Sequence, residues 1–558
     1  MTQLTQVAQP KLPPGHELSP RSVTGLPTRF GRKPALDGIR AIAVGSVIAY
    51  HFGSQQMNGG FLGVDMFFVL SGYLITSLLL VEWGRRSRID LGAFWAGRAR
   101  RLLPALIVAL LAVAAWSYFY ADPIRLDAIR QDGIWSLFSG VNWHFIVSGQ
   151  SYFDVFSEAS PLRHLWFLAI EVQFLLAWPL AVIALLHLGR GRTRFLTVFS
   201  LAGVIASSTL MVNLYRAGDP SRAYYGTDTR AGQLLIGALL AILLARWSPT
   251  TRASQRGLQS LGVAGIVLAV ATFVVATDQD TWLYHGGFLA FAVATALLIA
   301  AAVQPGHHVL GATLSLRPLR WVGKISYGLY LWHWPISIFL SESRIGISGW
   351  SLAFLRLGVT FAVAALSYYR LELPIRNSHW LSGRSGAILA PAAIGFTLLM
   401  ILASTAGAVP PPAFLTARPN QVLNTPKNTK GPTLPTNAPR MLLLGDSVAA
   451  SIGDALQAEA ASREIVLTAA TRPGCGMVTG IPANADGSEV PWGRTCADGT
   501  LPYLSDQATS SGAQVVLWLS TWETSDRIIN GRLVKFGTPA ADRALLAKLQ
   551  ESYATITA

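Results

Sequence analysis

The chain has 558 residues, of which 51% are hydrophobic and 13% charged, and its mean hydropathy is +0.41. Soluble domains carry about twice that share of charged residues. The composition therefore excludes a disordered chain and argues against a wholly soluble enzyme. Lys and Arg outnumber Asp and Glu by 44 to 29, a net charge of +15, and the two cysteines exclude a zinc ribbon or a disulfide-dense fold.

Apolar stretches of about 20 residues, long enough to cross the hydrocarbon of a bilayer, recur along the chain. We predict about eleven membrane-spanning helices. They lie near 38–55, 61–82, 102–121, 165–187, 195–213, 230–246, 259–277, 284–303, 326–341, 352–370 and 386–408. The polar, Pro-rich first 36 residues lack the apolar core of a cleavable signal peptide.

Charged residues alternate from one predicted loop to the next. Basic residues gather at 29–33, 85–101, 190–194, 246–256 and 317–324, and acidic ones at 122–132, 154–158 and 278–280. The positive-inside rule therefore predicts a cytoplasmic N-terminus, and an odd number of spans puts everything after about residue 409 outside. The basic excess follows from this topology, so no nucleic-acid partner is expected.

The C-terminal third of the chain differs from the rest. Residues 409–440 are rich in Pro, Thr and Asn and indicate a semi-extended linker. In 441–558, the segments MLLLGDS, EIVLTAA and AQVVLWLS are predicted strands, and 451–462 and 539–556 are predicted helices. Alternating strands and helices favour an α/β domain with a parallel sheet.

An ionisable residue inside a membrane span is expensive and marks a functional site by default. The first span carries Arg40 and His51. Their eleven-residue spacing gives an axial separation of about 16 Å on one helix face. This suits a donor with an anionic end beside Arg40 and a reacting group beside His51, a general base near neutral pH, and we expect a cavity joining the two. The structural alternative is a neutral core histidine with Arg40 reaching the headgroups.

Further polar groups follow along the chain. Ser71 and Gly72 are small enough for close packing against a neighbouring helix. Arg98, Arg100 and Arg101 form a cluster suited to phosphates, with ordinary positive-inside charge as the alternative. Other polar residues in or beside spans are Arg163, His164, Glu171, His333 and Glu372, the last among Arg370 and Arg376.

Residues 34–380 resemble the membrane-embedded acyltransferase-3 family. The motifs that carry the resemblance are LDGIRAIAVGSVIAYH, GGFLGVDMFFVLSGYLI, FWAGRARRLLPA, PLRHLWFLAIEVQF, YYGTDTRAGQLLIGALLA, GKISYGLYLWHWP and SYYRLELPIR. Seven motifs in order over about 350 residues make a specific signal. Some chains of this family carry one more span and an outer SGNH hydrolase-like domain, whose beginning 441–558 resembles.

The resemblance implies transfer of an acyl group, usually acetyl, from cytoplasmic acetyl-CoA or another acyl-CoA to an envelope carbohydrate. By motif, His51 is the base or acyl-accepting group, Arg40 acts with it, and Arg98 and Arg101 contact the CoA phosphates. The implied catalytic residues are His51, Arg40, Ser71, Glu171, Asp446 and Ser447. The implied donor-binding residues are Arg98, Arg101, Tyr327 and His333, and no metal is implied.

The predicted outer domain departs from the SGNH pattern. Gly445-Asp446-Ser447 matches the nucleophile block, and Gly474 matches the second block. Trp522 and Glu523 stand where the third block normally supplies Asn, and no histidine follows His379. A serine without a base is a weak nucleophile, so we expect a truncated domain without a complete Ser-His-Asp triad. Cys475 and Cys496 lie in this domain, where disulfides persist, and we predict that they pair.

The domains expected are a cytoplasmic tail (1–33), a ten-helix acyltransferase domain (34–380), an additional span (386–408), the linker (409–440) and the partial outer domain (441–558). The predicted function is multi-pass membrane O-acyltransferase, acting on an envelope glycan or a lipid-linked sugar. Two alternatives remain: an exporter of a small acylated metabolite, and an outer-face esterase, which the missing histidine disfavours.

Overall fold

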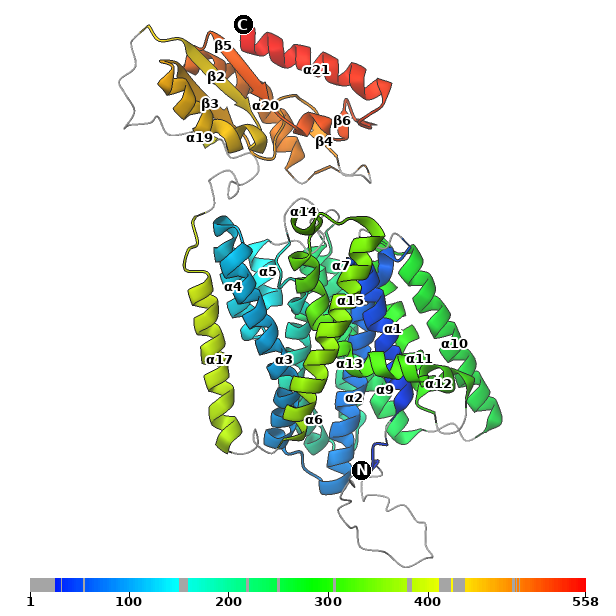
Figure 1. Ribbon diagram of the computed structural model, residues 1–558. Coiled ribbons are helices and arrows are strands. Elements are labelled where there is room, and N and C mark those ends of the chain that lie inside the picture. Colours follow the sequence, from blue (N-terminus) through cyan, green and yellow to red (C-terminus); the bar gives the residue numbers. More distant parts are fainter. Residues whose placement is uncertain are drawn as a thin grey trace, which may run out of the picture. The chain divides into compact units, whose positions relative to one another are not determined.

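The computed structural model describes residues 26–558 except 32, 54–55, 150–158, 217–219, 248–250, 279, 305–307, 379–383, 411–422, 425–436, 484–486, 488 and 491 (Figure 1). The chain divides into two units: a membrane unit that ends at residue 406, and a C-terminal unit that contains 407–558. Each is described by itself. The predicted tail 1–33 and linker 409–440 lie mostly outside the described residues, and their boundaries stay predictions.

The membrane unit is built of helices. Its longer helices are α1 (Pro34–His51), α2 (Gly63–Arg86), α3 (Leu91–Tyr120), α6 (Leu165–Leu188), α7 (Arg194–Leu214), α9 (Thr227–Arg246), α10 (Arg252–Val275), α11 (Phe288–Ala302), α13 (Arg317–Phe339), α15 (Gly349–Ser367) and α17 (Arg384–Ser404). The shorter ones are α4 (Leu126–Leu137), α5 (Val141–Ser148), α8 (Ser221–Tyr225), α12 (Val309–Leu314), α14 (Glu342–Ile345) and α16 (Leu373–Asn377).

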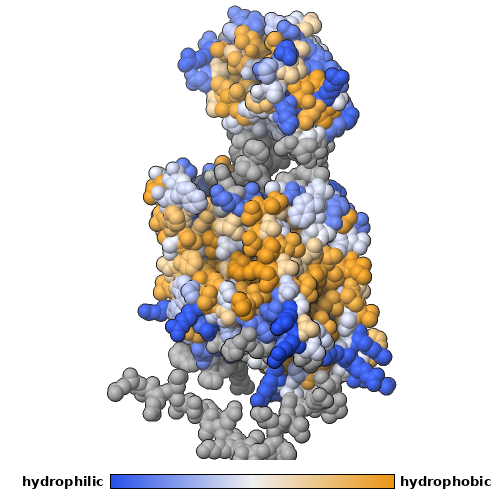
Figure 2. Space-filling model, turned by 90° about the vertical axis from the view of Figure 1, so that its right-hand side faces the viewer, coloured by the Kyte–Doolittle hydropathy of each residue, from blue (hydrophilic) through white to orange (hydrophobic). Residues whose placement is uncertain are grey.

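Apolar surface marks this unit as a membrane domain. Figure 2 shows hydrophobic residues across its middle and hydrophilic residues toward its ends. In the part of the chain that the structure describes, nine helical segments are long and apolar enough to cross a membrane. The predicted spans at 38–55 and 326–341 are helices α1 and α13, but neither is among those nine. The multi-pass helical class is thus confirmed, while the count of about eleven stays a prediction.

Close helix packing holds the centre of this unit. Gly72 of α2 lies against α9, where an added Cβ would stand 1.9 Å from the Leu234 carbonyl oxygen. Gly237 of α9 faces α2 in the same way, and a Cβ added there would stand 2.1 Å from the Val69 carbonyl oxygen. The predicted close approach at Gly72 is confirmed, because only glycine leaves the two backbones room to meet.

The C-terminal unit is an α/β fold, as predicted. Its elements are β1 (Leu423–Asn424), β2 (Arg440–Gly445), α19 (Ser447–Ser462), β3 (Val466–Thr471), β4 (Ile481–Pro482), α20 (Gly493–Ser511), β5 (Val515–Leu519), β6 (Arg527–Ile529), β7 (Arg532–Val534) and α21 (Pro539–Thr557). The main sheet has the order β1-β3-β2-β5, with β2 parallel to both β3 and β5. The sequence analysis missed α20 and the antiparallel sheet β4-β6-β7.

The central strand β2 is buried on both faces, as parallel strands usually are. Leu442 and Leu444 pack in one cluster with Tyr503 and Leu504 of α20, and Leu443 packs in another with Ala449 of α19. This buried strand ends at Gly445, immediately before Asp446 and Ser447. It fixes the turn on which the predicted nucleophile stands.

Candidate active site

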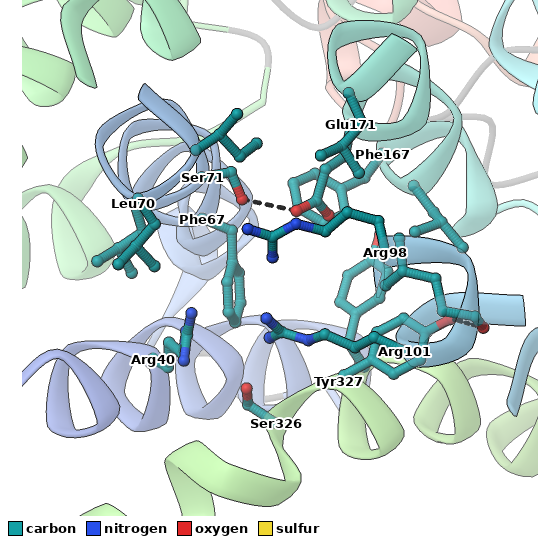
Figure 3. Close-up of a pocket in the computed structure, with 16 residues that line it drawn as sticks. Arg40, Phe67, Leu70, Ser71, Arg98, Arg101, Phe167, Glu171, Ser326 and Tyr327 are labelled. Carbon is teal, nitrogen blue, oxygen red and sulfur yellow. Dashed lines mark hydrogen bonds between the residues drawn. The ribbon is translucent and has the colours of Figure 1, made fainter. Parts of the chain in front are cut away.

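A pocket among the membrane helices collects most of the predicted site residues (Figure 3). The space between its lining side chains is about 730 Å³, open solvent included. The predicted residues that line it are Arg40 from α1, Ser71 from α2, Arg98 and Arg101 from α3, Glu171 from α6 and Tyr327 from α13. We call it the arginine pocket. Five helices therefore bring together residues that lie up to 287 positions apart, from Arg40 to Tyr327.

Positive charge dominates the arginine pocket. The guanidinium groups of Arg40, Arg98 and Arg101 point toward one another across it (Figure 3). Arg40 has a long contact with Asp37, at 3.4 Å, whereas Arg98 and Arg101 form no ion pair with any described residue. Three converging cations repel one another, so the arrangement favours an anion between them, and arginine forks suit phosphate oxygens.

Two hydrogen bonds join the helices that line this pocket. The Ser71 hydroxyl donates to Glu171 Oε1 at 2.6 Å, joining α2 to α6. The Tyr327 hydroxyl donates to the Leu102 carbonyl oxygen at 2.7 Å, one residue after Arg101. Tyr327 thus holds the arginine-bearing segment of α3 against α13. Its predicted contact with a donor molecule stays a prediction.

A second, wider cavity of about 1260 Å³ of empty volume shares Arg40, Arg101 and Tyr327 with the arginine pocket. It adds three basic side chains, those of Lys33, Lys324 and Arg376, and two carboxylates, those of Asp37 and Glu372. Basic residues therefore continue from the arginine pocket into a larger space. A ligand with several phosphates, such as a nucleotide, matches this distribution of charge.

The two predicted histidines form a separate cluster. His51 is the last residue of α1, and its Nδ1 lies 2.9 Å from Nε2 of His333 on α13. Neither imidazole lines the arginine pocket. The structure therefore places His333, predicted to bind the donor, beside the predicted base instead. The His51 ring also packs against Trp334, with ring centres 4.7 Å apart, so it does not simply face lipid.

Aromatic rings separate the histidines from the arginine pocket. Phe67, Phe167 and Tyr330 line the pocket, and the rings of Phe167 and Tyr330 lie 5.0 Å apart. The Tyr330 ring also lies 5.5 Å from that of His333. The arginine pocket therefore extends from Arg40 to Tyr330, which contacts His333. The expected cavity that joins Arg40 to His51 stays a prediction.

Sequence reasoning gave no role to His164 or Tyr330, although both stand in the quoted motifs. His164 is 2% exposed, and its Nε2 donates to the Leu331 carbonyl oxygen at 3.0 Å. The Tyr330 hydroxyl donates to the His164 carbonyl oxygen at 2.5 Å. The signal that was available is the presence of a histidine at the start of a span, which is costly unless it has a structural or chemical use.

A buried ion pair lies elsewhere in the membrane unit. Arg230 of α9 donates to Asp65 of α2 at 2.9 Å, and both side chains are fully buried. Four aromatic rings surround the guanidinium, at 4.4 Å (Phe288), 5.0 Å (Tyr224) and 5.7 Å (Phe68 and Trp166). One carboxylate and four ring faces thus compensate the charge of Arg230, although its Nε and Nη1 have no hydrogen-bond partner among the described residues. Such a pair of opposite charges inside one domain is typical of a structural pair.

In the C-terminal unit, Asp446 fixes the turn before Ser447. Its Oδ1 accepts a hydrogen bond from the Val448 backbone N–H at 2.8 Å, which caps α19. Its Oδ2 accepts from the backbone N–H groups of Thr521 and Trp522, at 2.6 and 3.1 Å. With both oxygens used in this way, Asp446 positions Ser447 and ties β2 to the segment after β5. The catalytic roles predicted for both residues stay predictions.

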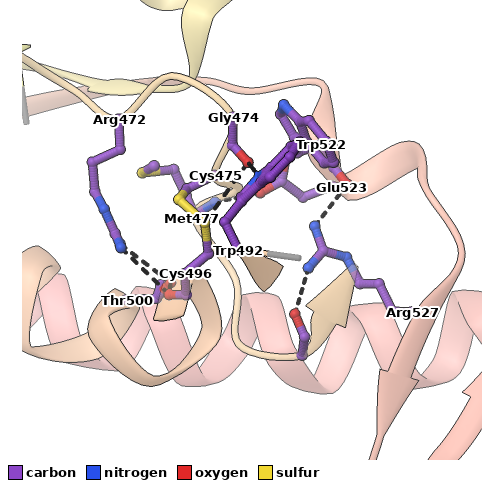
Figure 4. Close-up of a disulfide and its surroundings, with 11 residues drawn as sticks. Arg472, Gly474, Cys475, Met477, Trp492, Cys496, Thr500, Trp522, Glu523 and Arg527 are labelled. Carbon is purple, nitrogen blue, oxygen red and sulfur yellow. Dashed lines mark hydrogen bonds between the residues drawn. A yellow bond between two sulfur atoms is a disulfide. The ribbon is translucent and has the colours of Figure 1, made fainter. Parts of the chain in front are cut away.

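The predicted pairing of Cys475 with Cys496 is confirmed (Figure 4). The disulfide joins the segment after β3 to α20, where Arg472 also donates to the Cys496 carbonyl oxygen. Nearby, Glu523 accepts from the Met477 backbone N–H at 2.6 Å, so it fastens the loop that follows Gly474. Burial lowers the pKa of Arg527, which donates to the Gly480 and Trp522 carbonyl oxygens.

No group of three or more His, Cys, Asp and Glu side chains gathers among the described residues in a way that could hold a metal ion.

A multi-pass helical domain with an arginine pocket and a pair of hydrogen-bonded imidazoles, followed by an α/β domain, defines the class of protein. The chain belongs to the acyltransferase family: residues 33–369 match the acyltransferase domain, and residues 417–556 match the SGNH domain that is fused to AT3 domains. Both resemblances expected from the motifs are confirmed.

The chain is similar to several curated proteins. Over 363 residues it is 41% identical to the peptidoglycan O-acetyltransferase OatA of Listeria monocytogenes, covering 64% of this chain and 58% of the relative. It is 39% identical over 348 residues to the O-acetyltransferase OatA of Staphylococcus aureus (62% and 57%). It is 40% identical over 395 residues to YrhL of Bacillus subtilis (67% and 61%). These alignments span about three fifths of each relative. No solved structure matches.

Proposed function

We propose that the protein is an O-acyltransferase that passes an acetyl group from cytoplasmic acetyl-CoA to a carbohydrate of the cell envelope. The observation that carries this proposal is the arginine pocket, where Arg40, Arg98 and Arg101 converge and the last two form no ion pair with any residue that the structure describes. Three cations close together in a membrane domain favour the binding of a polyanionic ligand. Coenzyme A has such an anionic end and carries the acyl group at the other.

The names of the Listeria and Staphylococcus relatives give the reaction and, for Listeria, the acceptor: O-acetyl transfer to peptidoglycan. We extend both to this chain as a proposal, with a lipid-linked sugar as the alternative acceptor. In the reaction, the acceptor hydroxyl gives its proton to His51 while its oxygen attacks the thioester carbonyl. The C–O bond forms, the C–S bond breaks, and the thiolate of CoA leaves and is protonated.

The orientation follows from the distribution of basic loops. We propose a cytoplasmic N-terminus and an extracytoplasmic C-terminal unit. This puts the basic segments 29–33, 85–101 and 317–324, and with them the cavity that holds Lys33 and Lys324, on the side where acetyl-CoA is made. A periplasmic or extracellular reporter enzyme fused after residue 558 is expected to be active, and the same reporter inserted after residue 192 inactive. The opposite pattern contradicts the orientation.

A direct test uses purified full-length chain in liposomes with acetyl-CoA labelled in the acetyl group. We expect release of free CoA thiol and transfer of label to added peptidoglycan fragments. The His51→Ala variant is expected to lose both while inserting into the membrane normally. An exporter of an acylated metabolite predicts instead that the intact labelled molecule crosses the bilayer without thiol release, and that result contradicts the proposal.

Mass spectrometry of envelope glycans identifies the acceptor. Cells with and without the gene are compared for acetyl esters, each about 42 Da in mass. We expect peptidoglycan sugars to lose acetyl groups in the deletion strain and to regain them with the wild-type gene. If peptidoglycan is unchanged and another glycan loses acetyl groups, that glycan is the acceptor, and the proposed class of reaction still holds.

A further inference from the structure

The contacts of His333 fix where its proton lies. Its Nδ1 is 2.6 Å from the carbonyl oxygen of Tyr330, one turn earlier on α13. A carbonyl oxygen can only accept a hydrogen bond, so Nδ1 of His333 carries a hydrogen. A neutral imidazole has one N–H, which leaves the lone pair on Nε2 of His333.

This lone pair faces the predicted base. Nδ1 of His51 lies 2.9 Å from Nε2 of His333, so one nitrogen donates to the other. Because Nε2 of the neutral His333 is an acceptor, Nδ1 of His51 is the donor. The lone pair of His51 must then be on its Nε2. The order of hydrogen bonds runs from His51 Nδ1–H to His333 Nε2, and from His333 Nδ1–H to the backbone of α13.

We propose that His333 is a positioning residue that holds His51 in the Nδ1–H tautomer, so that Nε2 of His51 is the nitrogen that receives the proton of the acceptor hydroxyl. The proposal deepens the proposed acetyl transfer and rests on it for its kinetic consequences. During the step, the hydroxyl proton moves to Nε2, the acceptor oxygen bonds to the acetyl carbon, and CoA leaves as a thiolate.

The surroundings of the pair suit a fixed orientation. His333 is 0% exposed, so its ring has no solvent partner to exchange for His51. The His164 ring lies 5.7 Å from that of His333. Trp334 packs on the His51 ring, and the Arg163 guanidinium lies over Trp334 at 4.9 Å. In serine hydrolases a carboxylate fixes the tautomer of the catalytic histidine. Here the acceptor for Nδ1–H is a second imidazole, which is itself anchored to a helix backbone.

The test combines spectroscopy with kinetics on the full-length chain in liposomes. With 15N-histidine labelling, solid-state NMR distinguishes protonated from unprotonated ring nitrogens, and the His51 signals are those lost in His51→Asn. We expect wild-type His51 to be protonated at Nδ1. His333→Gln, whose amide oxygen can accept from His51, keeps this tautomer. His333→Phe has no acceptor, and the proton of His51 moves to Nε2.

Kinetics separate positioning from donor binding. We expect His333→Phe to lower kcat for CoA release by about 100-fold or more, the usual contribution of a general base, with KM for acetyl-CoA unchanged. His333→Gln is expected to stay within about 10-fold of wild type. His187→Gln, an exposed histidine at the end of α6, is the matched control and keeps wild-type rates.

Three results overturn the proposal: wild-type His51 protonated at Nε2, an unchanged tautomer in His333→Phe, or equal losses in His333→Gln and His333→Phe. If His333→Phe does not fold, the wild-type tautomer and the behaviour of His333→Gln still decide the matter. A wild-type protein that shows the expected tautomer but releases no CoA refutes the proposed reaction and leaves the role of His333 in orienting His51 standing.

Discussion

The buried pair Arg230–Asp65 offers the sharpest stability prediction. Both side chains are 0% exposed and 2.9 Å apart. Removing one partner of such a pair leaves an uncompensated buried charge and costs about 3–5 kcal/mol. We expect Arg230→Met to reach this range, because it leaves the Asp65 carboxylate alone. Asp65→Asn is expected to cost less, since the aromatic rings around Arg230 continue to stabilise the cation by up to about 2 kcal/mol.

A double-mutant cycle measures the pair itself. In Arg230→Met/Asp65→Asn neither charge remains, so the double variant is expected to lose less than the sum of the single variants, by about 2 kcal/mol or more. The assay is unfolding of the detergent-solubilised protein by a denaturing detergent, followed by tryptophan fluorescence. Arg222→Met is the matched control, because its pair with Asp228 is about one-third exposed and such pairs contribute about 0–1 kcal/mol. Additivity of the two single variants within about 0.5 kcal/mol refutes the reasoning.

Three other predictions follow from the site and the C-terminal unit. Arg98→Ala and Arg101→Ala are each expected to raise KM for acetyl-CoA by about 10- to 100-fold, because each loses one charge-assisted hydrogen bond. Arg100 does not line the pocket, so Arg100→Ala is expected to keep the wild-type KM. Equal effects of all three substitutions contradict the proposed phosphate contacts of Arg98 and Arg101. Cys475→Ser/Cys496→Ser opens a loop of sequence separation 21 and is expected to destabilise the C-terminal unit by about 3 kcal/mol, measured by pulse proteolysis in urea; an unchanged midpoint contradicts this. Burial raises the pKa of Tyr503 above its ordinary value, so as the pH rises this phenol ionises first in the unfolded chain. The stability that Tyr503 contributes is therefore present below about pH 10 and is lost as the pH rises further. In pulse proteolysis, Tyr503→Phe is expected to flatten this alkaline loss of stability, and an identical loss in both proteins contradicts the assignment.

Hydropathy predicted the helical architecture because the bilayer leaves few choices. A backbone inside hydrocarbon must satisfy its own hydrogen bonds, so a long apolar segment is a helix. The boundaries were less accurate: the first predicted span, 38–55, is helix Pro34–His51. Proline at the first turn favours a helix start, and this signal at Pro34 was available in the sequence. The span predicted at 326–341 begins nine residues earlier, at Arg317, again just before a proline.

The C-terminal unit shows two kinds of missed element. The β6–β7 hairpin turns at Asn530-Gly531, both with positive φ, and Asn-Gly between apolar residues is a strong hairpin signal that the sequence already contained. Helix α20 gave no such signal, because Gly493–Ser511 is rich in Gly, Thr and Ser and contains Pro502. Those residues have low helix propensity. Its packing on β2 through Tyr503 and Leu504 overrides that propensity.

For the membrane site, the sequence supplied candidates but not their partners. The rule that buried ionisable groups are functional selected Arg40, His51 and His333 one by one. It could not pair His51 with His333, 282 positions away. Helical periodicity orders residues along one helix, and contacts between helices depend on packing that no single segment specifies. For the same reason, Arg40 and His51 were correctly placed on one helix, yet the position of Tyr330 between the arginine pocket and His333 was not foreseen.

Two kinds of arginine occur in one membrane domain, a buried one and a half-buried cluster, and their surroundings differ. Arg230 has its own carboxylate and four aromatic faces, so nothing further is required to neutralise it. Arg40, Arg98 and Arg101 share the arginine pocket with one lining carboxylate, that of Glu171, which also accepts a hydrogen bond from Ser71. The cation on α9 has a carboxylate of its own, whereas the three arginines of the pocket face a single lining carboxylate, and Arg98 and Arg101 form no ion pair with the residues that the structure describes. The simplest physical reason is that the compensating charge arrives with the substrate, and the arginine substitutions described above test it directly.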